Sequence, residues 1–299
     1  MKLLPDISYI DSDLGIEFLK THNFNYYQKD NEKTIFHVYW YGKINRNHVC
    51  CINSYLATQN LEKTELWVWL DYDTIELSKN SIPKNKNIVV KEYNPNIESK
   101  DTPLENNNLL NQNKYLKFRS DLARIIFLYK YGGVYYDLDM ILLKNFEPLL
   151  GIEFCYKWST QKGANNGLLR FFKKSKILET IILKYVKFLA PFQKPGKNFN
   201  YQVNDIHKNI YTEELDIMCF PSIMFDPVWM ILDTKLKSKY SNLTNFDDFF
   251  KYTEEDVNKF FDNQIFAYHW HSRSNVVAEK NSYFDKIEKQ INLKISSSK

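Results

Sequence analysis

The stretch that most constrains the fold of this chain is residues 118–143, in which a helical pattern runs through two glycines into a strand pattern. Apolar residues recur there at the spacing of one buried helical stripe: Leu122, Ile125, Ile126 and Tyr129. Asp121 and Arg124 lie one turn apart on the same helix, away from that stripe. Gly132 and Gly133 then end the helix, because glycine readily adopts the backbone conformation that closes one. The pattern therefore predicts a helix, a tight turn and a strand in direct succession.

Beyond the glycines, two alternating sets of residues run from Val134 to Leu143. In a strand, this alternation places Asp137 and Asp139 on one face, with Tyr135 beside them. Two carboxylates flanked by apolar residues repel each other and resist burial unless a cation or a basic group lies between them. Mg²⁺ and Mn²⁺ take oxygen ligands and commonly bind one or two carboxylates together with substrate phosphates. The pair is therefore a candidate metal site, although an isolated Asp-x-Asp more often faces water at a strand end.

The segment from Ser120 to Asp139 resembles the signature of a known family. Its Ser-Asp-x-x-Arg helix, its Tyr-Gly-Gly-Val-Tyr turn and its Asp-x-Asp pair resemble those of the D-x-D sugar transferases of glycosyltransferase family 32 and of the glucosylating domain of the large clostridial toxins. Upstream, residues 36–42 resemble the first strand of the same domain, where a tryptophan, here Trp40, stacks on the nucleotide base. A core tryptophan is the alternative for Trp40. The resemblance covers residues 35–150 well and the remainder loosely.

The resemblance implies a retaining hexosyltransferase that moves a sugar from a nucleotide diphosphate to an acceptor hydroxyl. Asp139 would bind Mn²⁺ or Mg²⁺ directly, and Asp137 would act on the metal through water or hold the ribose and the sugar. Arg124 and Asp121 would hold phosphate and donor hydroxyls, with Tyr135 flanking the ribose. The resemblance favours a UDP-sugar as donor, although some relatives use guanine nucleotides, and it leaves a glycan, a protein or a lipid-linked acceptor open. Because no carboxylate can be named as a covalent nucleophile, a front-side displacement assisted by the leaving phosphate is the more economical hypothesis.

Residues 264–270 have a strand pattern that runs into Ser272 and Arg273. His269 and His271 fall on one face of that strand, an arrangement that a metal site can use. The resembling family ends its catalytic domain with a His, Asn or Glu that completes the metal shell, in a motif that closes with Ser-Trp. Here Arg273 follows Ser272, so the tryptophan is missing. The resemblance favours His269 as third ligand and His271 second, with surface histidines as the alternative. Arg273 could reach the diphosphate as a charge-assisted donor, and Ser272 is a further candidate for cofactor binding.

Strand and helix patterns alternate through the first half of the chain. Strands are expected at residues 34–41, 65–70 and 87–93, and a helix at residues 47–60, with Asn47 as its N-cap. Their order predicts a mainly parallel sheet flanked by helices, with ligands outside the carboxyl ends of the strands. The resemblance makes this a GT-A-like, Rossmann-type α/β fold with a variable C-terminal acceptor-side region.

Two further polar stretches belong to this half of the chain. The Asn-rich residues 94–113 have the composition of a mobile surface loop. A second Asp-x-Asp, formed by Asp71 and Asp73, follows the strand at residues 65–70 without the helix or the Gly-Gly turn, and we interpret it as a strand-end loop near the nucleotide.

We divide the chain into a lead-in at residues 1–33, a nucleotide-sugar-binding α/β core at 34–150, and an acceptor-side region with a closing strand at 151–299 of the same catalytic domain. In the last part, Asn165 and Asn166 precede a glycine. The resembling enzymes have an Asn-rich turn here that faces the transferred sugar and the acceptor, and a plain Asn-Gly turn is the alternative. An apolar helix is expected from Ile177 to Ala190.

The composition of the chain indicates which kinds of partner it can bind and in which compartment it is found. Forty basic and 36 acidic residues leave a net charge of only +4, and their interspersed order argues against nucleic-acid binding. The four cysteines fit neither a disulfide framework nor a zinc pattern, which favours a reducing compartment or buried thiols. Because no apolar run reaches the length of a transmembrane segment and no signal-peptide core is recognised, we expect a soluble, cytoplasmic protein, with peripheral membrane association left open.

Two other classes of function fit parts of the pattern. A non-catalytic module that binds a sugar nucleotide or a glycan would keep Trp40 and the fold, but it has no need for Asp137, Asp139 and His269 together. A metal-dependent phosphohydrolase or nucleotidyltransferase typically requires more clustered carboxylates for two ions, and the sequence offers one clear pair.

Overall fold

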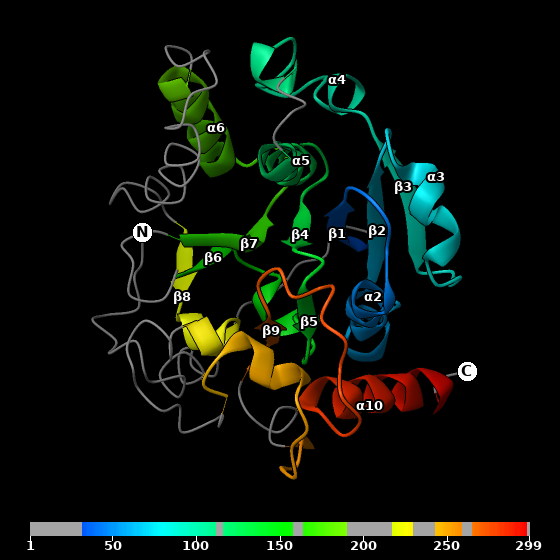
Figure 1. Cartoon of the computed structure of the whole chain (residues 1–299). Helices are drawn as coiled ribbons and strands as arrows, with labels where there is room; N and C mark the ends of the chain where they lie inside the picture. Colours follow the sequence, from blue (N-terminus) through cyan, green and yellow to red (C-terminus); the bar gives the residue numbers. More distant parts are fainter. Residues whose placement is uncertain are drawn as a thin grey trace.

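The computed structural model describes residues 32–111, 116–157, 164–189, 217–229, 243–258 and 265–297, so nearly all of the expected lead-in lies outside the described residues. Nine strands are present in them: β1 (Thr34–Trp40), β2 (Thr64–Asp71), β3 (Ile88–Tyr93), β4 (Gly133–Tyr136), β5 (Met140–Leu142), β6 (Phe154–Lys157), β7 (Ala164–Phe171), β8 (Met218–Phe220) and β9 (Ala267–His269). Seven of them form one sheet in the order β3-β2-β1-β4-β7-β6-β8, and β5 pairs with β9 in a second sheet (Figure 1).

The main sheet is largely parallel. Strand β1 runs parallel to β2 and β4, and β2 runs parallel to β3. Strand β7 runs antiparallel to both β4 and β6, whereas β6 and β8 are parallel. Strand β7 is therefore the single reversed strand of this seven-stranded sheet, which confirms the predicted fold class.

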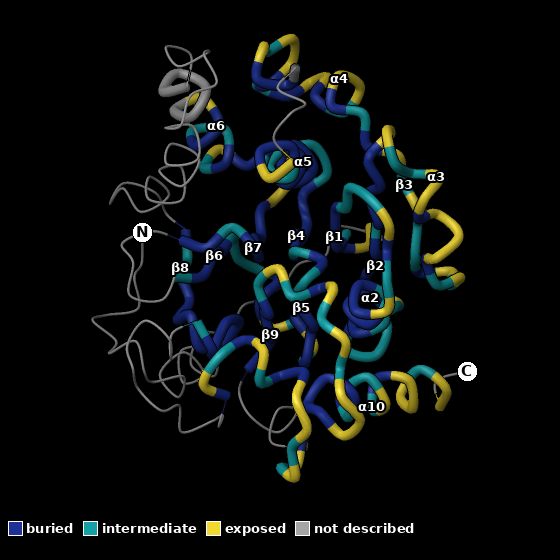
Figure 2. The backbone as a smooth tube through the Cα atoms, in the orientation of Figure 1, coloured by how far each residue is buried: buried dark blue, intermediate teal, exposed yellow. Residues whose placement is uncertain are grey.

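Helices cover both faces of the sheet. The longer helices are α2 (Arg46–Thr58), α5 (Leu116–Tyr131), α6 (Lys176–Leu189) and α10 (Tyr283–Ser297). Helices α2 and α10 pack with β5 and β9 in one hydrophobic cluster, and α5 and α6 pack in a second cluster on the other face. Figure 2 shows β4 and most of β1 and β7 as buried between these layers, whereas the edge strand β3 is largely intermediate or exposed. No helix among the described residues is long and apolar enough to cross a membrane.

The Gly-Gly turn after α5 has the predicted role. The helix ends at Tyr131, and Gly132 donates its amide to the Leu128 carbonyl at 3.0 Å. Gly133 has a φ of +105°, and a Cβ atom there would lie 2.0 Å from the Ile35 carbonyl oxygen. Only glycine can bring β4 this close to β1, because any side chain would collide with the backbone of the neighbouring strand.

The predicted strand through the Asp-x-Asp pair is wrong in one respect. Strand β4 stops at Tyr136, and a turn closed by a 3.0 Å bond from the Met140 amide to the Asp137 carbonyl carries Asp137 and Asp139. The chain then resumes as β5, which belongs to the second sheet. The strand pattern continues through the turn because both flanking strands are buried, so alternation alone cannot reveal the break.

Three other local predictions require correction. Helix α2 is capped by Asn45 rather than Asn47, since the Asn45 side chain accepts the amides of Asn47 and His48, and the helix ends at Thr58. Residues 94–111 are not a loose surface loop. They contain the helix α4 (Pro95–Glu98) and a 3-10 helix (Asn108–Asn111), and three leucines there pack into the α5 cluster: Leu104, Leu109 and Leu110.

The C-terminal half follows the expected elements more closely. Helix α6 and strand β9 lie where an apolar helix and a closing strand were predicted, although β9 is only three residues long. Asn165 and Asn166 are not in a plain turn, because both belong to β7. Strands β6, β7 and β8 extend the same sheet as β1 to β4, so the C-terminal half completes the sheet.

Candidate active site

A cavity of about 440 Å³ opens where β1 and β4 end and β7 begins. Because β7 runs antiparallel to β4, its first residues lie at the same edge of the sheet as the Asp-x-Asp turn. The lining residues come from all parts of the described chain: Tyr39, Trp40, Tyr41, Leu116, Lys117, Ser120, Asp121, Arg124, Asp137, Leu138, Asp139, Asn165, Asn166, His269, His271 and Ser272. The edge matches the expected position for a ligand in such a sheet.

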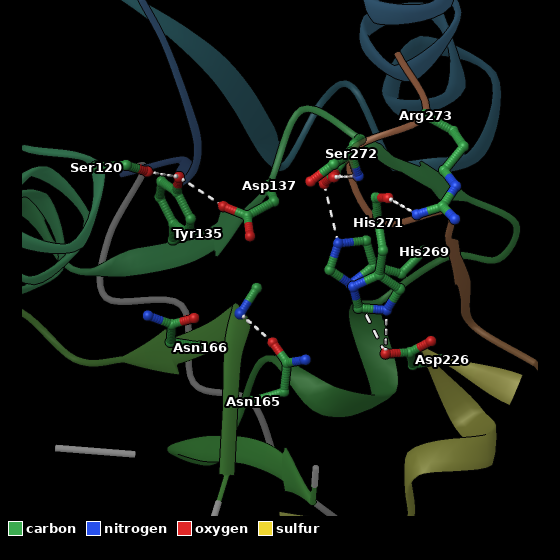
Figure 3. A network of polar contacts seen from close by, with 12 residues as sticks. Ser120, Tyr135, Asp137, Asn165, Asn166, Asp226, His269, His271, Ser272 and Arg273 are labelled. Atoms are coloured by element: carbon green, nitrogen blue, oxygen red, sulfur yellow. Dashed lines mark hydrogen bonds and ion pairs between the residues drawn. The ribbon is translucent and has the colours of Figure 1, made fainter. Parts of the chain in front are cut away.

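Asp137 is held from three sides at the start of the turn. Its amide donates to the Gly167 carbonyl at 2.7 Å, which fixes the backbone against β7. Its Oδ1 accepts the Tyr135 hydroxyl at 2.9 Å (Figure 3). The same oxygen lies 3.2 Å from Nη2 of Arg124. Burial raises the pKa of Asp137, and the charge of Arg124 opposes this rise only in part.

Asp139 faces the C-terminal strand. Its Oδ1 lies 2.9 Å from Nε2 of His269, and its Oδ2 accepts the Ser272 amide at 2.8 Å. Its carbonyl accepts the Trp270 amide at 3.2 Å, so β5 and β9 tie the carboxylate to the histidine strand. Burial raises the pKa of Asp139, but the charge and hydrogen bond of His269 outweigh burial and hold that pKa below its usual range.

The two histidines lie together beside the acidic pair. Their rings stack with centroids 3.6 Å apart, although β9 ends at His269 and His271 has a φ of +46°. Burial lowers the pKa of His269, but Asp139 and Asp226 raise it to about 9 overall. Nε2 of His271 lies 2.7 Å from Asp226 Oδ2. Without a metal, the site is therefore neutralised by an ion pair between His269 and Asp139.

The residues present fit a divalent cation. Asp137, Asp139 and His269 each offer one ligand atom, and these atoms lie within 4.8 Å of one another. Two carboxylates and one imidazole suit Mn²⁺. Mg²⁺ prefers oxygen ligands, which the two carboxylates offer. A Cβ atom on Gly167 would lie 3.0 Å from Cε1 of His269 and 3.1 Å from Oδ2 of Asp137. Because Gly167 has no side chain, the β7 backbone can lie close to both His269 and Asp137, two of the candidate ligands.

A second polar group lies on α5. Arg124 is 3.4 Å from Asp121 and donates to the Asn166 carbonyl at 2.6 Å, and the Asn166 side chain donates to Asp121 at 2.7 Å. The guanidinium also lies 4.8 Å from the centre of the Tyr135 ring. Burial raises the pKa of Asp121 to about 6, in spite of the neighbouring Arg124. Asp121 and Arg124, which helical spacing predicted to lie together, are thus joined to β7. With Asn166 they present a carboxyl group, a guanidinium group and an amide to the cavity.

Aromatic residues at the end of β1 form another wall. Tyr39, Trp40 and Tyr41 all line the cavity. Trp40 is half-buried, its Nε1 donates to the Lys43 carbonyl at 3.2 Å, and its ring lies 4.0 Å from that of His48. The indole is therefore anchored at one end while its ring borders the cavity, as a stacking platform requires.

Two residues predicted to contact a cofactor do not line the cavity. Tyr135 is fully buried, and its hydroxyl donates to Asp137. Arg273 also lies outside the lining residues, pairs with Asp247 at 3.0 Å and donates to the His271 carbonyl. His271 and Ser272, which precede Arg273, both have a positive φ.

Sequence reasoning missed several residues of the site. Lys117 and Ser120 share a helical face with Asp121 and Arg124, so helical spacing contained the signal for both. Asp226 had no such signal, because it approaches the histidines from a segment distant in sequence.

Residues 45–155 match the family model described as a glycosyltransferase sugar-binding region containing the DXD motif. This segment is therefore similar to the sugar-binding region of DXD glycosyltransferases. It includes α2, the Asp121 and Arg124 helix, the Gly-Gly turn and the acidic pair, and it ends before the two histidines. The match confirms the resemblance on which the sequence interpretation rests.

Individual relatives are distant. Over 92 residues the chain is 27% identical to inositol phosphoceramide mannosyltransferase 3 of Schizosaccharomyces pombe, an alignment that covers 31% of this chain and 26% of that protein. The chain thus matches about a quarter of the length of this relative. The glycosyltransferase GlyE of Streptococcus pneumoniae superposes with a TM-score of 0.51 at 12% identity, over 90% of this chain and 64% of that chain. The PaToxG glycosyltransferase gives a TM-score of 0.48 at 17% identity, over 61% of this chain and 69% of that chain. The likeness to GlyE is one of fold.

Proposed function

We propose that this chain is a metal-dependent hexosyltransferase that moves a sugar from a UDP-sugar to an acceptor hydroxyl with retention at the anomeric carbon. The observation that carries the proposal is the convergence of Asp137, Asp139 and His269 in the cavity that also contains Trp40 and the Asp121 and Arg124 pair. A binding module would need the aromatic wall and the fold, but not a cation cradle beside them.

The cavity suggests how a donor lies. The nucleobase stacks on Trp40, which borders the cavity at the end of β1. The diphosphate lies over the acidic pair, where Asp137, Asp139 and His269 would hold Mn²⁺ or Mg²⁺. When bound, the cation neutralises the charge that develops on the departing diphosphate.

The sugar then lies against α5 and β7. Asp121 accepts hydrogen bonds from donor hydroxyls, and Asn166 holds Asp121 in place. Arg124 keeps the acidic residues ordered, since it contacts both Asp121 and Asp137. Asn165, His271 and Ser272 complete the lining on the histidine side, and we assign this side to the acceptor.

Retention is the favoured stereochemical outcome. The carboxylates that line the cavity each have a basic partner: Asp121 and Asp137 contact Arg124, and Asp139 contacts His269. A carboxylate held in this way is poorly placed to attack an anomeric carbon. We therefore propose front-side displacement, in which the acceptor oxygen replaces the phosphate oxygen on one face of the sugar and the acceptor proton passes to the leaving phosphate.

We further propose that residues 34–150 bind the nucleotide and that residues 151–299 form the acceptor side of the same catalytic domain. The site draws on both parts, because Asn166 and His269 complete groups that begin with Asp121 and Asp139. The acceptor is a glycan, a protein or a lipid-linked glycan.

A panel of nucleotide sugars tests the proposal. We expect Mn²⁺-dependent turnover of a UDP-hexose, with the product's anomeric configuration retained as read by NMR. Sugar release at one rate with and without acceptors would favour a hydrolase, and nucleotide-sugar binding without turnover would favour a binding module. An inverted product would exclude the front-side displacement.

A further inference from the structure

Asp226 lies beside the two histidines and does not line the cavity. Its side chain is 0% exposed, and its Oδ2 lies 2.7 Å from Nε2 of His271 and 3.8 Å from Nδ1 of His269. Figure 3 shows both contacts meeting at one oxygen. Among the described residues, none is a hydrogen-bond partner of its Oδ1. A buried carboxylate with a partnerless oxygen costs stability, which indicates that its charge serves the site rather than the packing.

The orientation of His269 decides whether it can bind a metal. Its Nε2 faces Asp139 at 2.9 Å, so a cation between Asp137 and Asp139 would meet this nitrogen. Nε2 is free to bind only when the ring proton is on Nδ1. Nδ1 lies 3.3 Å from the Tyr156 hydroxyl and 3.8 Å from Asp226. Carboxylates behind a ligating histidine generally fix its tautomer and increase its basicity.

Asp226 also acts on the His269 ring indirectly, through His271. The His271 ring stacks on His269 at 3.6 Å, and the short contact with Asp226 holds it there. His271 therefore acts as a wall that keeps the His269 ring from rotating away from Asp139.

We infer that Asp226 is a positioning residue of the metal site: its buried negative charge holds the ring proton of His269 on Nδ1 and anchors the His271 ring, so that Nε2 faces Asp137 and Asp139. The inference rests on the proposed function, because it assigns a role at the same metal site. Asp226, His269 and His271 also have ligand atoms within 4.8 Å of one another. The short contact with His271 and the complete burial of Asp226 favour positioning over a second cation site, which the experiment distinguishes by stoichiometry.

The decisive variant is Asp226→Asn, which keeps the shape and an acceptor oxygen for His271 but removes the charge. Free Mn²⁺ in a titration of the full chain is measured by electron paramagnetic resonance. We expect one Mn²⁺ per chain and a Kd that rises about 10- to 100-fold in the variant. The metal-free melting temperature stays unchanged, whereas a purely structural role would lower it. The matched control is Asp247→Asn, since Asp247 is an exposed partner of Arg273, and its Kd should equal that of the unmodified chain.

Two further measurements make the outcome unambiguous. Tyr156→Phe removes the hydroxyl near Nδ1 but leaves the charge, so its Kd should rise less than that of Asp226→Asn. Nitrogen NMR of ¹⁵N-histidine in the unmodified, Mg²⁺-loaded chain reports the tautomer without any substitution, and a proton on Nε2 of His269 would overturn the inference. Unaltered Mn²⁺ binding by Asp226→Asn, or two Mn²⁺ per chain, would also overturn it while leaving the proposed function intact. An unmodified chain that binds no Mn²⁺ would remove the proposed metal site as well.

Discussion

The chain contains an Asp-x-Asp motif at the ends of two parallel strands. One copy is paired with an arginine, and the other lines the cavity. At the end of β2, Asp71 is 0% exposed, contacts Arg119 at 2.7 Å and accepts the Tyr39 hydroxyl at 2.6 Å. Asp73 also contacts Arg119, at 3.0 Å. After β4, Asp137 and Asp139 line the cavity. We call the first pair the closed motif and the second the open motif.

The partner explains the difference between the motifs. Arg119 is a permanent cation that contacts both carboxylates of the closed motif, so no place remains for a metal. The open motif has Arg124 at Asp137 but only His269 at Asp139. A histidine can lose its proton and become a ligand itself, whereas an arginine cannot. In the proposed function, the open motif can therefore hold a metal because His269 can exchange its proton for one, whereas Arg119 keeps its charge beside the closed motif.

The largest effect is expected from Asp139→Asn in the open motif. The substitution keeps the volume but removes a charge that would hold the cation. We expect transferase activity to fall by about a thousand-fold, equivalent to about 4 kcal/mol of transition-state stabilisation. Chelation of the metal from the unmodified chain should produce a loss of similar size that added Mn²⁺ restores. A variant with normal Mn²⁺-dependent activity would contradict the assignment of the open motif.

Asp71→Ala in the closed motif should have the opposite profile. It leaves Arg119 buried with only Asp73 as an acidic partner, and we expect the free energy of unfolding to fall by about 3 kcal/mol. Denaturant titration measures this loss. Mn²⁺ affinity of the folded fraction should stay as in the unmodified chain, and a large decrease in that affinity would show that the closed motif also serves the metal.

Gly167→Ala disturbs the open motif without substituting either of its carboxylates. The added methyl group would lie 3.0 to 3.1 Å from Asn165, His269 and Asp137, all of which line the cavity. Displacing these side chains should lower the rate of sugar transfer by up to about 100-fold, equivalent to about 2.7 kcal/mol. Steady-state kinetics should show that loss, while the melting temperature changes little. A fully active variant would show that the added methyl group does not displace the residues of the open motif.

His37 lies between the strands that lead to the two motifs: its Nε2 bonds to the Gly132 carbonyl just before β4 at 2.9 Å, and its Nδ1 accepts Nε1 of Trp69 on β2 at 3.1 Å. Burial lowers the pKa of His37 to about 3, so the folded chain keeps the ring neutral where the unfolded chain is protonated. Its contribution to stability is complete above the unfolded pKa of 6.5 and falls as pH decreases toward 3. Between pH 7 and pH 5 this loss is about 2 kcal/mol. Denaturant unfolding of His37→Gln should lack this part of the acid sensitivity, and identical pH profiles would refute it.

The smallest effects separate two neighbouring residues of β1. Trp40→Ala should raise the KM for the donor about tenfold, because base stacking on an aromatic ring contributes about 1 to 3 kcal/mol. Tyr39→Phe keeps the ring but loses the bond to Asp71, so it should lower the free energy of unfolding by about 1.5 kcal/mol and leave KM within about twofold. The reverse pattern would place the nucleobase on Tyr39.

Much of the site was predictable because its signal is local. Asp121 and Arg124 share a helical turn, and Asp137 and Asp139 are two residues apart, so short-range geometry brings each pair together. Gly132 and Gly133 were recognisable because glycine readily adopts the conformation that closes a helix, and the structure adds that a side chain at Gly133 would collide with the backbone of β1. In contrast, the positions of the Tyr135 and Arg273 side chains outside the cavity lining were not predictable, because which way a side chain faces depends on neighbours from other elements.

The sequence by itself determined the alternation of strands and helices in the first half of the chain, the helix-to-turn junction and the acidic pair, since these depend on the spacing of residues near one another in the chain. Tertiary structure alone decided which Asp-x-Asp is open, which groups lie beside it and that Asp226 lies beside the histidines. The reason is physical: the charge state and accessibility of a carboxylate depend on partners within a few ångströms. Here those partners, Arg119, His269 and Asp226, come from segments far apart in the sequence.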